Sequence, residues 1–110
     1  MQMKLKATRL VITDALRDYC QLKMDKIEKY LGSVAVVNCD VEISKTVGDQ
    51  RHGDIFSAEV NLEVPHQLLR VERTASDMYK AIDKAQEHLK LVIKKYKDKE
   101  TRSKNLRGAI

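Results

Sequence analysis

The stretch FSAEVNLEVPHQLLRVERTA, residues 56–75, decides the fold. Apolar and polar side chains alternate as far as Val64, and a period of two is typical of a strand with one buried face. Pro65 lacks the N–H that a ladder needs and ends this strand. A second strand follows over 69–75, with Leu69, Val71 and Ala75 facing inward.

Two more strands are predicted upstream. Residues 37–44 alternate in the same way, and their inward side chains are Val37, Cys39, Val41 and Ile43. The connection VGDQRHGD, residues 47–54, contains two glycines and predicts a turn. A short first strand is predicted from the inward side chains Met3, Leu5 and Ala7. The three strands over 37–44, 56–64 and 69–75 are joined by short connections and predict an antiparallel meander.

Two amphipathic helices are available to cover the apolar face of this sheet. The first begins after the cap residue Thr13 and ends before Gly32. Its apolar stripe is Leu16, Cys20, Ile27 and Leu31, widened by Ile12, Tyr19 and Tyr30. The second covers residues 76–99, with the stripe Met78, Ile82, Ala85, Leu89, Ile93 and Tyr96. The order β-α-β-β-β-α predicts an α+β two-layer sandwich, in which a four-stranded sheet carries both helices on one face.

Length and composition favour one domain. The chain has 110 residues, 43% hydrophobic, which is enough for one core and too little for two. We expect a domain over 1–97 and a flexible basic tail over 98–110, because the tail has no periodicity. No apolar run approaches a membrane span, and the N-terminus lacks a signal peptide core. Cys20 and Cys39 are expected to be buried free thiols, so a cytoplasmic location is predicted.

The positive charge is concentrated at the C-terminal end. Residues 80–107 hold ten Lys and Arg against four Asp and Glu, a net +6 within a total of +5, so the rest carries −1. Such asymmetry is typical of a protein that binds a polyanion. The outer sheet face is predicted to be mildly acidic and without aromatic side chains, which argues against base stacking there. The helical layer is therefore the candidate surface, although a merely solvated lysine face is the competing interpretation.

Lys23 stands out on the first helix, because its position falls within the apolar arc. An unpaired charge should not be buried. One interpretation is a lysine whose stem packs while its ammonium reaches water. The other is a lysine in the groove between the helices, beside Lys26 and Lys29, that reaches toward RNA. Both can hold together.

Signals for catalysis are weak. The histidines His52, His66 and His88 share no ligand spacing, and no phosphate-binding loop is present. A small enzyme that uses Asp83, Glu87 and His88 is an alternative hypothesis, and it requires a concave pocket around them. We predict a binding module with no catalytic residue, metal, cofactor or small-molecule substrate, and with no membrane partner.

Three segments together resemble a known family. LVITDALRDYCQLKMDKIEKYL (10–31), AEVNLEVPHQLLRVE (58–72) and DMYKAIDKA with KKYKDK (77–85, 94–99) resemble the bacterial ribosome hibernation promoting factors and ribosome-associated inhibitors. The resemblance implies a fold akin to a double-stranded RNA-binding domain. It also implies binding to ribosomal RNA phosphates in the decoding region of the small ribosomal subunit. There the domain would exclude messenger RNA and transfer RNA under stress or in stationary phase. A general double-stranded RNA-binding module remains the alternative.

The predicted RNA-binding residues combine this resemblance with the charge pattern. Family basic positions are matched by Arg17, Lys23, Lys26 and Lys29 on the first helix and by Lys95, Lys97 and Lys99 at the end of the last. The outer face of the last helix adds Lys80, Lys84, Lys90 and Lys94. Tyr79, in the family signature, is predicted either at the edge of the core or as a base-stacking group.

This chain also departs from the family pattern. Leu91 replaces a basic residue, so that position predicts either weaker RNA contact or contact with an apolar part of a ribosomal protein. His88 also replaces a lysine, and His66 and Gln67 replace a Gly-Gly turn.

Overall fold

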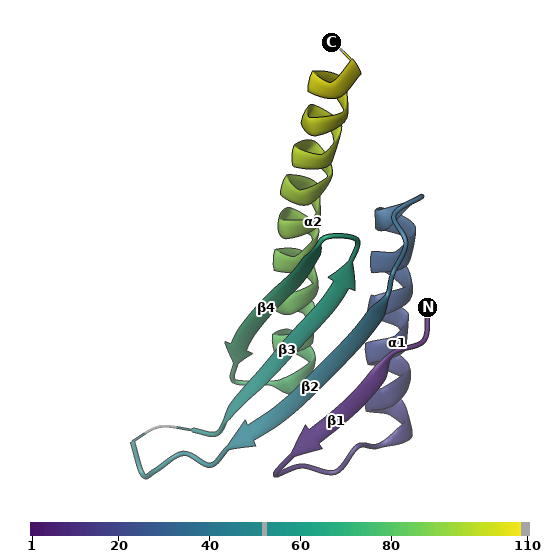
Figure 1. Ribbon diagram of the computed structural model, residues 1–110. Coiled ribbons are helices and arrows are strands. Elements are labelled where there is room, and N and C mark those ends of the chain that lie inside the picture. Colours follow the sequence, from purple (N-terminus) through teal and green to yellow (C-terminus); the bar gives the residue numbers. More distant parts are fainter. Residues whose placement is uncertain (52, 109–110) are drawn as a thin grey trace.

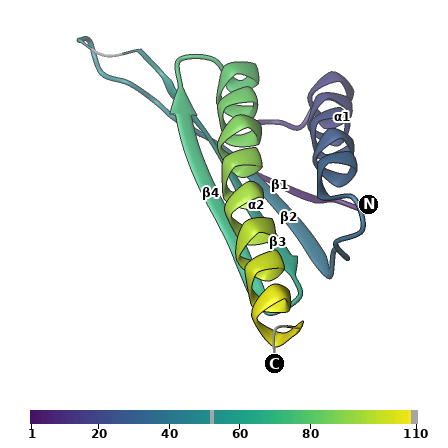
Figure 2. The same cartoon turned by 90° about the horizontal axis from the view of Figure 1, so that it is seen from above.

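The computed structural model describes residues 1–51 and 53–108, the side chains of 103–108 excepted. The element order is β1 (Lys4–Thr8), α1 (Asp14–Leu31), β2 (Asn38–Thr46), β3 (Ile55–Val64), β4 (Gln67–Ala75) and α2 (Met78–Gly108). The strands form one sheet, and both helices cover the same face of it (Figures 1 and 2). The predicted α+β two-layer sandwich is therefore confirmed. His52 lies outside the described residues.

The sheet has the spatial order β1-β2-β3-β4. β1 runs parallel to β2, which α1 makes possible as the crossover, while β2, β3 and β4 pair antiparallel as the predicted meander. The register places Val41 beside Val60 and Val60 beside Val71, and all three are buried. A one-residue slip would turn this row to water, so the apolar face itself specifies the register.

The ends of α1 follow from local chemistry. The Thr13 hydroxyl accepts a hydrogen bond from the Leu16 N–H at 3.1 Å, which satisfies one of the free donors of the first turn. At the other end Gly32 adopts φ 64° and its N–H bonds to the Lys29 carbonyl. That backbone conformation favours glycine. The predicted bounds of this helix are confirmed.

The core lies between the sheet and the two helices. Ile27 from α1, Leu62 from β3 and Leu89 and Ile93 from α2 are fully buried. Met24 on α1 is also buried, in addition to the predicted stripe.

Two predicted core positions are wrong. Val37 is 62% exposed, because β2 begins one residue later and Val37 belongs to the segment leading into it. Tyr30 is 38% exposed, since it lies at the margin of the α1 stripe. In addition, β4 begins at Gln67, and Pro65 and His66 alone form the turn before it.

α2 is longer than predicted. It continues to Gly108, so the prediction that the helix ends near Lys99 is wrong. The apolar stripe ends at Tyr96, where packing against the sheet ends, but no Gly or Pro occurs from there to Arg107 to stop the helix. The last turns project beyond the sheet in Figure 1. The flexibility of residues 98–110 stays a prediction, and Ala109 and Ile110 lie outside the described residues.

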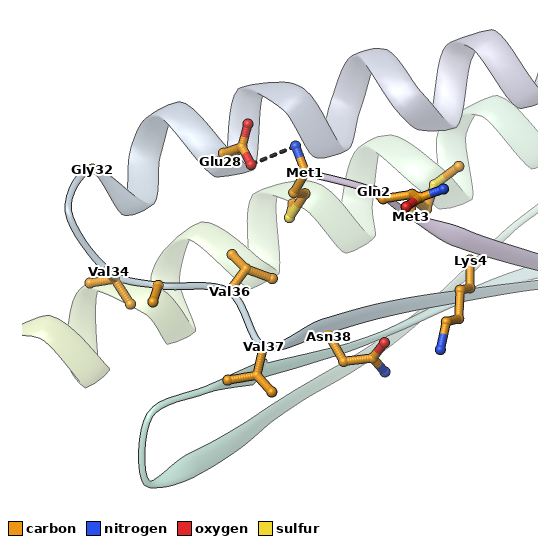
Figure 3. A pocket seen from close by; sticks show the side chains of 11 residues that line it. Met1, Gln2, Met3, Lys4, Glu28, Gly32, Val34, Val36, Val37 and Asn38 are labelled. Carbon is orange, nitrogen blue, oxygen red and sulfur yellow. Dashed lines mark ion pairs between the residues drawn. The ribbon is translucent and has the colours of Figure 1, made fainter.

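A hollow of about 810 Å³ opens between the residues before β1, the end of α1 and the segment before β2 (Figure 3). Met1 is held there by an ion pair between its ammonium and Glu28 and by a 3.3 Å hydrogen bond from Gln21 to its carbonyl. Much of the remaining lining is apolar, including Val34 and Val36. Lys4 is its one basic side chain, so the hollow does not suit a polyanion.

Candidate nucleic-acid interface

α1 and α2 lie side by side over the sheet, and their outward surfaces form the helical layer (Figure 2). Ten of the eleven predicted RNA-binding residues lie on it with their charges near or at the surface, as exposed or partly buried side chains, and the eleventh, Lys23, is mostly buried. The helical period sorts these residues into three groups.

The first group faces the boundary between the helices. Lys26 of α1 contributes to the electrostatic field at Asp83 of α2, which places it on this side. Lys97 of α2 donates a 3.0 Å hydrogen bond to the Tyr30 carbonyl of α1, and its ammonium lies 5.4 Å from the Tyr30 ring centroid. The helical period puts Lys90 and Lys94 on the same flank of α2 as Lys97.

The other two groups lie further out. Lys29 of α1 and Lys80 of α2 are on the crests of their helices, directed away from the sheet. The outer flanks carry Arg17 on α1 and Lys84, Lys95 and Lys99 on α2. The predicted set is therefore spread over the helical layer and does not converge on one point, which suits an extended chain of phosphates better than a single anion.

Lys23 joins the two helices. Its side chain is 16% exposed, and its ammonium lies 3.0 Å from Oδ1 of Asp83. The Tyr19 hydroxyl donates to the same oxygen at 2.5 Å, and the Lys23 ammonium lies 5.1 Å from the Tyr19 ring centroid. Gln86 of α2 donates to the Lys23 carbonyl at 3.2 Å. Neither interpretation of Lys23 from the sequence included this paired carboxylate.

These contacts shift the titration of all three groups. The hydrogen bond with Asp83 raises the pKa of Lys23 and that of Tyr19. Partial burial alone would raise the pKa of Asp83, but the hydrogen bonds from Tyr19 and Lys23 outweigh it and lower that pKa. At neutral pH the cluster is thus a lysine ammonium, a carboxylate and a neutral phenol.

Tyr79 extends the cluster to the surface. Its ring is 41% exposed and meets the Tyr19 ring edge-on, with centroids 4.9 Å apart. Tyr79 is therefore at the edge of the helix packing, and part of its side chain remains exposed to a partner.

The outer face of the sheet is acidic, in contrast to the basic helical layer. In the sheet register Glu42, Glu59 and Glu72 lie side by side on three strands. Glu59 accepts from Asn61 and pairs with Arg70 at 3.3 Å. The hydrogen bond between Glu59 and Glu72 raises the pKa of Glu72, as expected where two carboxylates crowd together. The outer sheet face is unsuited to phosphates, and the predicted acidic character is confirmed.

The enzyme hypothesis requires Asp83, Glu87 and His88 around one pocket. Asp83 is paired with Lys23, and the hollow that His88 lines with Leu91 and Val92 is lined by neither Asp83 nor Glu87. Over residues 1–51 and 53–102 no three His, Cys, Asp or Glu side chains are grouped so that they could hold a metal ion. Neither helix, over its described length, is long and apolar enough to cross a membrane.

Comparison with known proteins identifies the family. The sequence profile described as "Sigma 54 modulation protein / S30EA ribosomal protein" matches residues 3–101. The chain belongs to this family. Among curated relatives, proteins named "Ribosome hibernation promotion factor" are 30% identical over 95 residues in Deinococcus radiodurans and 31% identical over 102 residues in Lactococcus lactis. They confirm the resemblance inferred from the sequence.

The matches cover this chain better than the relatives. They span 86% and 93% of this chain, but 48% and 52% of those two proteins. The chain therefore spans about half the length of the curated relatives it matches.

Solved structures agree with the fold. The N-terminal domain of Thermus thermophilus Protein Y is 32% identical, with a TM-score of 0.70 over 84% of this chain and 94% of that one. A ribosomal subunit interface protein from Coxiella burnetii has a TM-score of 0.66 at 19% identity over 89% of this chain and 99% of that one. The second likeness concerns the fold alone.

Proposed function

We propose that this chain is a ribosome hibernation factor that binds the small ribosomal subunit through its helical layer. It would occupy the decoding region and exclude messenger RNA and transfer RNA under stress or in stationary phase. The observation that carries the proposal is the division of charge between the two faces. Basic residues cover the helical layer, and the glutamate row Glu42, Glu59 and Glu72 lies on the other side of the sheet.

The relatives support the same proposal through their names. Proteins named for ribosome hibernation share about 30% of their residues with this chain. The role is one of binding and occupancy, which needs no catalytic group, and it is carried out in the cytoplasm.

The physical mechanism is neutralisation of phosphates. The exposed residues Lys80, Lys84, Lys94 and Lys95 on α2 and Lys26 and Lys29 on α1 are free to approach a ribosomal RNA backbone. Each phosphate contact releases counterions, so binding weakens steeply as salt rises. Lys23 contributes differently, because its ammonium is already paired with Asp83. It holds α1 against α2 and so keeps the lysines of the two helices at a constant spacing.

The test removes the same number of positive charges from each of two faces of the protein. K80Q/K84Q removes two positive charges from the helical layer, and the matched control K4Q/K6Q removes two from the outer sheet face, where Lys4 and Lys6 are also exposed. Affinity for purified small subunits is measured across a salt series. The helical variant should lower the salt slope by about two, one for each lost phosphate contact, and the control should leave it unchanged.

Three outcomes would contradict the proposal. Equal losses from both variants would mean that the helical layer is not the binding surface. Equal affinity of the unmodified protein for ribosomes and for an arbitrary RNA duplex would favour the general double-stranded RNA-binding module. Binding that transfer RNA fails to displace would argue against occupation of the decoding region.

A further inference from the structure

Leu91 is an apolar side chain in the middle of the proposed RNA-binding layer. It is 62% exposed on the crest of α2. Lys94 and Lys95 follow about one helical turn later. A large apolar group gains nothing from a phosphate, and its exposure to water is unfavourable. Exposure alone does not distinguish Leu91, because Leu68 is also 57% exposed; what distinguishes Leu91 is its place among the lysines of the proposed RNA-binding layer.

A hollow opens beside this side chain. It has a volume of about 370 Å³ and is lined by His88, Leu91, Val92, Lys94, Lys95 and Asp98. We call it the Leu91 hollow. Its volume is more than ten times the share of one water molecule in the liquid, about 30 Å³, so an amino-acid side chain fits inside.

The mixture of groups fits a protein better than a nucleic acid. Leu91 and Val92 give the hollow an apolar lining, which an apolar side chain complements and a phosphate does not. Lys94 and Lys95 are suited to a carboxylate as well as to a phosphate. Lysines beside a small apolar lining thus complement a segment that carries an apolar side chain and an acidic one.

We propose that the Leu91 hollow binds an apolar side chain of a protein segment whose neighbouring carboxylate pairs with Lys94 or Lys95. The inference rests on the proposed function, in that the segment is presented at the surface of the small ribosomal subunit. α2 then contacts protein at its centre and RNA phosphates on either side.

The test uses two substitutions of Leu91, one of which has opposite effects for a protein contact and for an RNA contact. If Leu91 meets an apolar protein surface, Leu91→Ala weakens binding to purified small subunits about tenfold without a change in salt slope. Leu91→Lys weakens it at least as much, despite the added charge. If phosphates face this position, Leu91→Lys binds more tightly and its salt slope grows by about one, which would overturn the inference. Leu68→Ala, at a 57% exposed leucine on the outer sheet face, is the matched control and should not change binding.

A second readout identifies the partner class directly. A photoreactive benzophenone group placed at position 91 should cross-link to a protein of purified small subunits, and cross-linking to RNA alone would overturn the inference. The two proposals can fail separately. If the unmodified protein does not bind ribosomes, both proposals are wrong. If it binds tightly and Leu91→Ala leaves the binding unchanged, only the proposed protein contact is wrong.

Discussion

The cluster between the helices makes a prediction about stability. Asp83→Asn keeps the size of the side chain and an oxygen that can accept from Tyr19, so the substitution removes mainly the charge. Lys23, at 16% exposure, is then left without its carboxylate. We expect the folded state to lose stability because this ammonium cannot regain full hydration without moving out of the helix boundary.

The size of the loss follows from the exposure of the pair. A hydrogen bond to a charged group contributes about 1.5–3 kcal/mol when shielded from water. Asp83 is 42% exposed, which screens the interaction, and we therefore take about 1–1.5 kcal/mol, nearer to a surface pair. For a domain of this size that corresponds to a fall in Tm of roughly 4–8 °C.

The measurement is thermal or urea unfolding at pH 7 and at acid pH. Glu87→Gln is the matched control, since Glu87 is an exposed carboxylate on the same helix, and it should change stability by less than about 0.5 kcal/mol. The pKa of Asp83 is lowered in the folded protein. Its contribution is therefore complete above the unfolded value of about 3.9 and is lost as pH falls through the lower folded value.

The difference between the unmodified protein and Asp83→Asn should accordingly shrink as the pH falls below about 4. Two results would refute this reasoning. The first is an Asp83→Asn variant as stable at pH 7 as Glu87→Gln. The second is a difference that persists unchanged at acid pH, since it would show that the charge on Asp83 is not its source.

Other predictions concern single side chains. His66 adopts φ 70° in the two-residue turn before β4, so His66→Gly should raise stability by about 1 kcal/mol in urea unfolding; a loss would mean that its side chain has a favourable contact. Thr13→Ala removes the cap of α1 and should cost about 1 kcal/mol, whereas an unchanged urea midpoint would contradict a role for the cap. Burial raises the pKa of the Cys20 and Cys39 thiols to about 11, so a thiol reagent at pH 8 should label them only on unfolding, and rapid labelling of the folded protein would refute their burial.

Much of the fold could be predicted because its signals are local. Alternation around Val60 and the cap at Thr13 depend on neighbouring residues alone, and both predictions are confirmed. The end of α2 could not be predicted in the same way. The stripe that ends at Tyr96 reports packing against the sheet, while the helix itself continues as long as no Gly or Pro interrupts it.

The site was less predictable, because it depends on how two helices meet. The charge of the helical layer can be counted from the sequence, and the exposed lysines are found there. That Lys23 pairs with Asp83, sixty residues further on, depends on the axial offset of α1 against α2, which no local pattern encodes. The available signal was Asp83 itself, a carboxylate among lysines on the last helix, but its position in the sequence does not show which lysine it pairs with.

The central claim is that the helical layer binds ribosomal RNA phosphates of the small subunit. Sedimentation of the protein with separated small and large ribosomal subunits, repeated across a salt series, tests it most directly. We predict co-sedimentation with small subunits that weakens steeply as salt rises and is lowered by K80Q/K84Q. No binding to small subunits at low salt, with binding to free duplex RNA retained, would contradict the account.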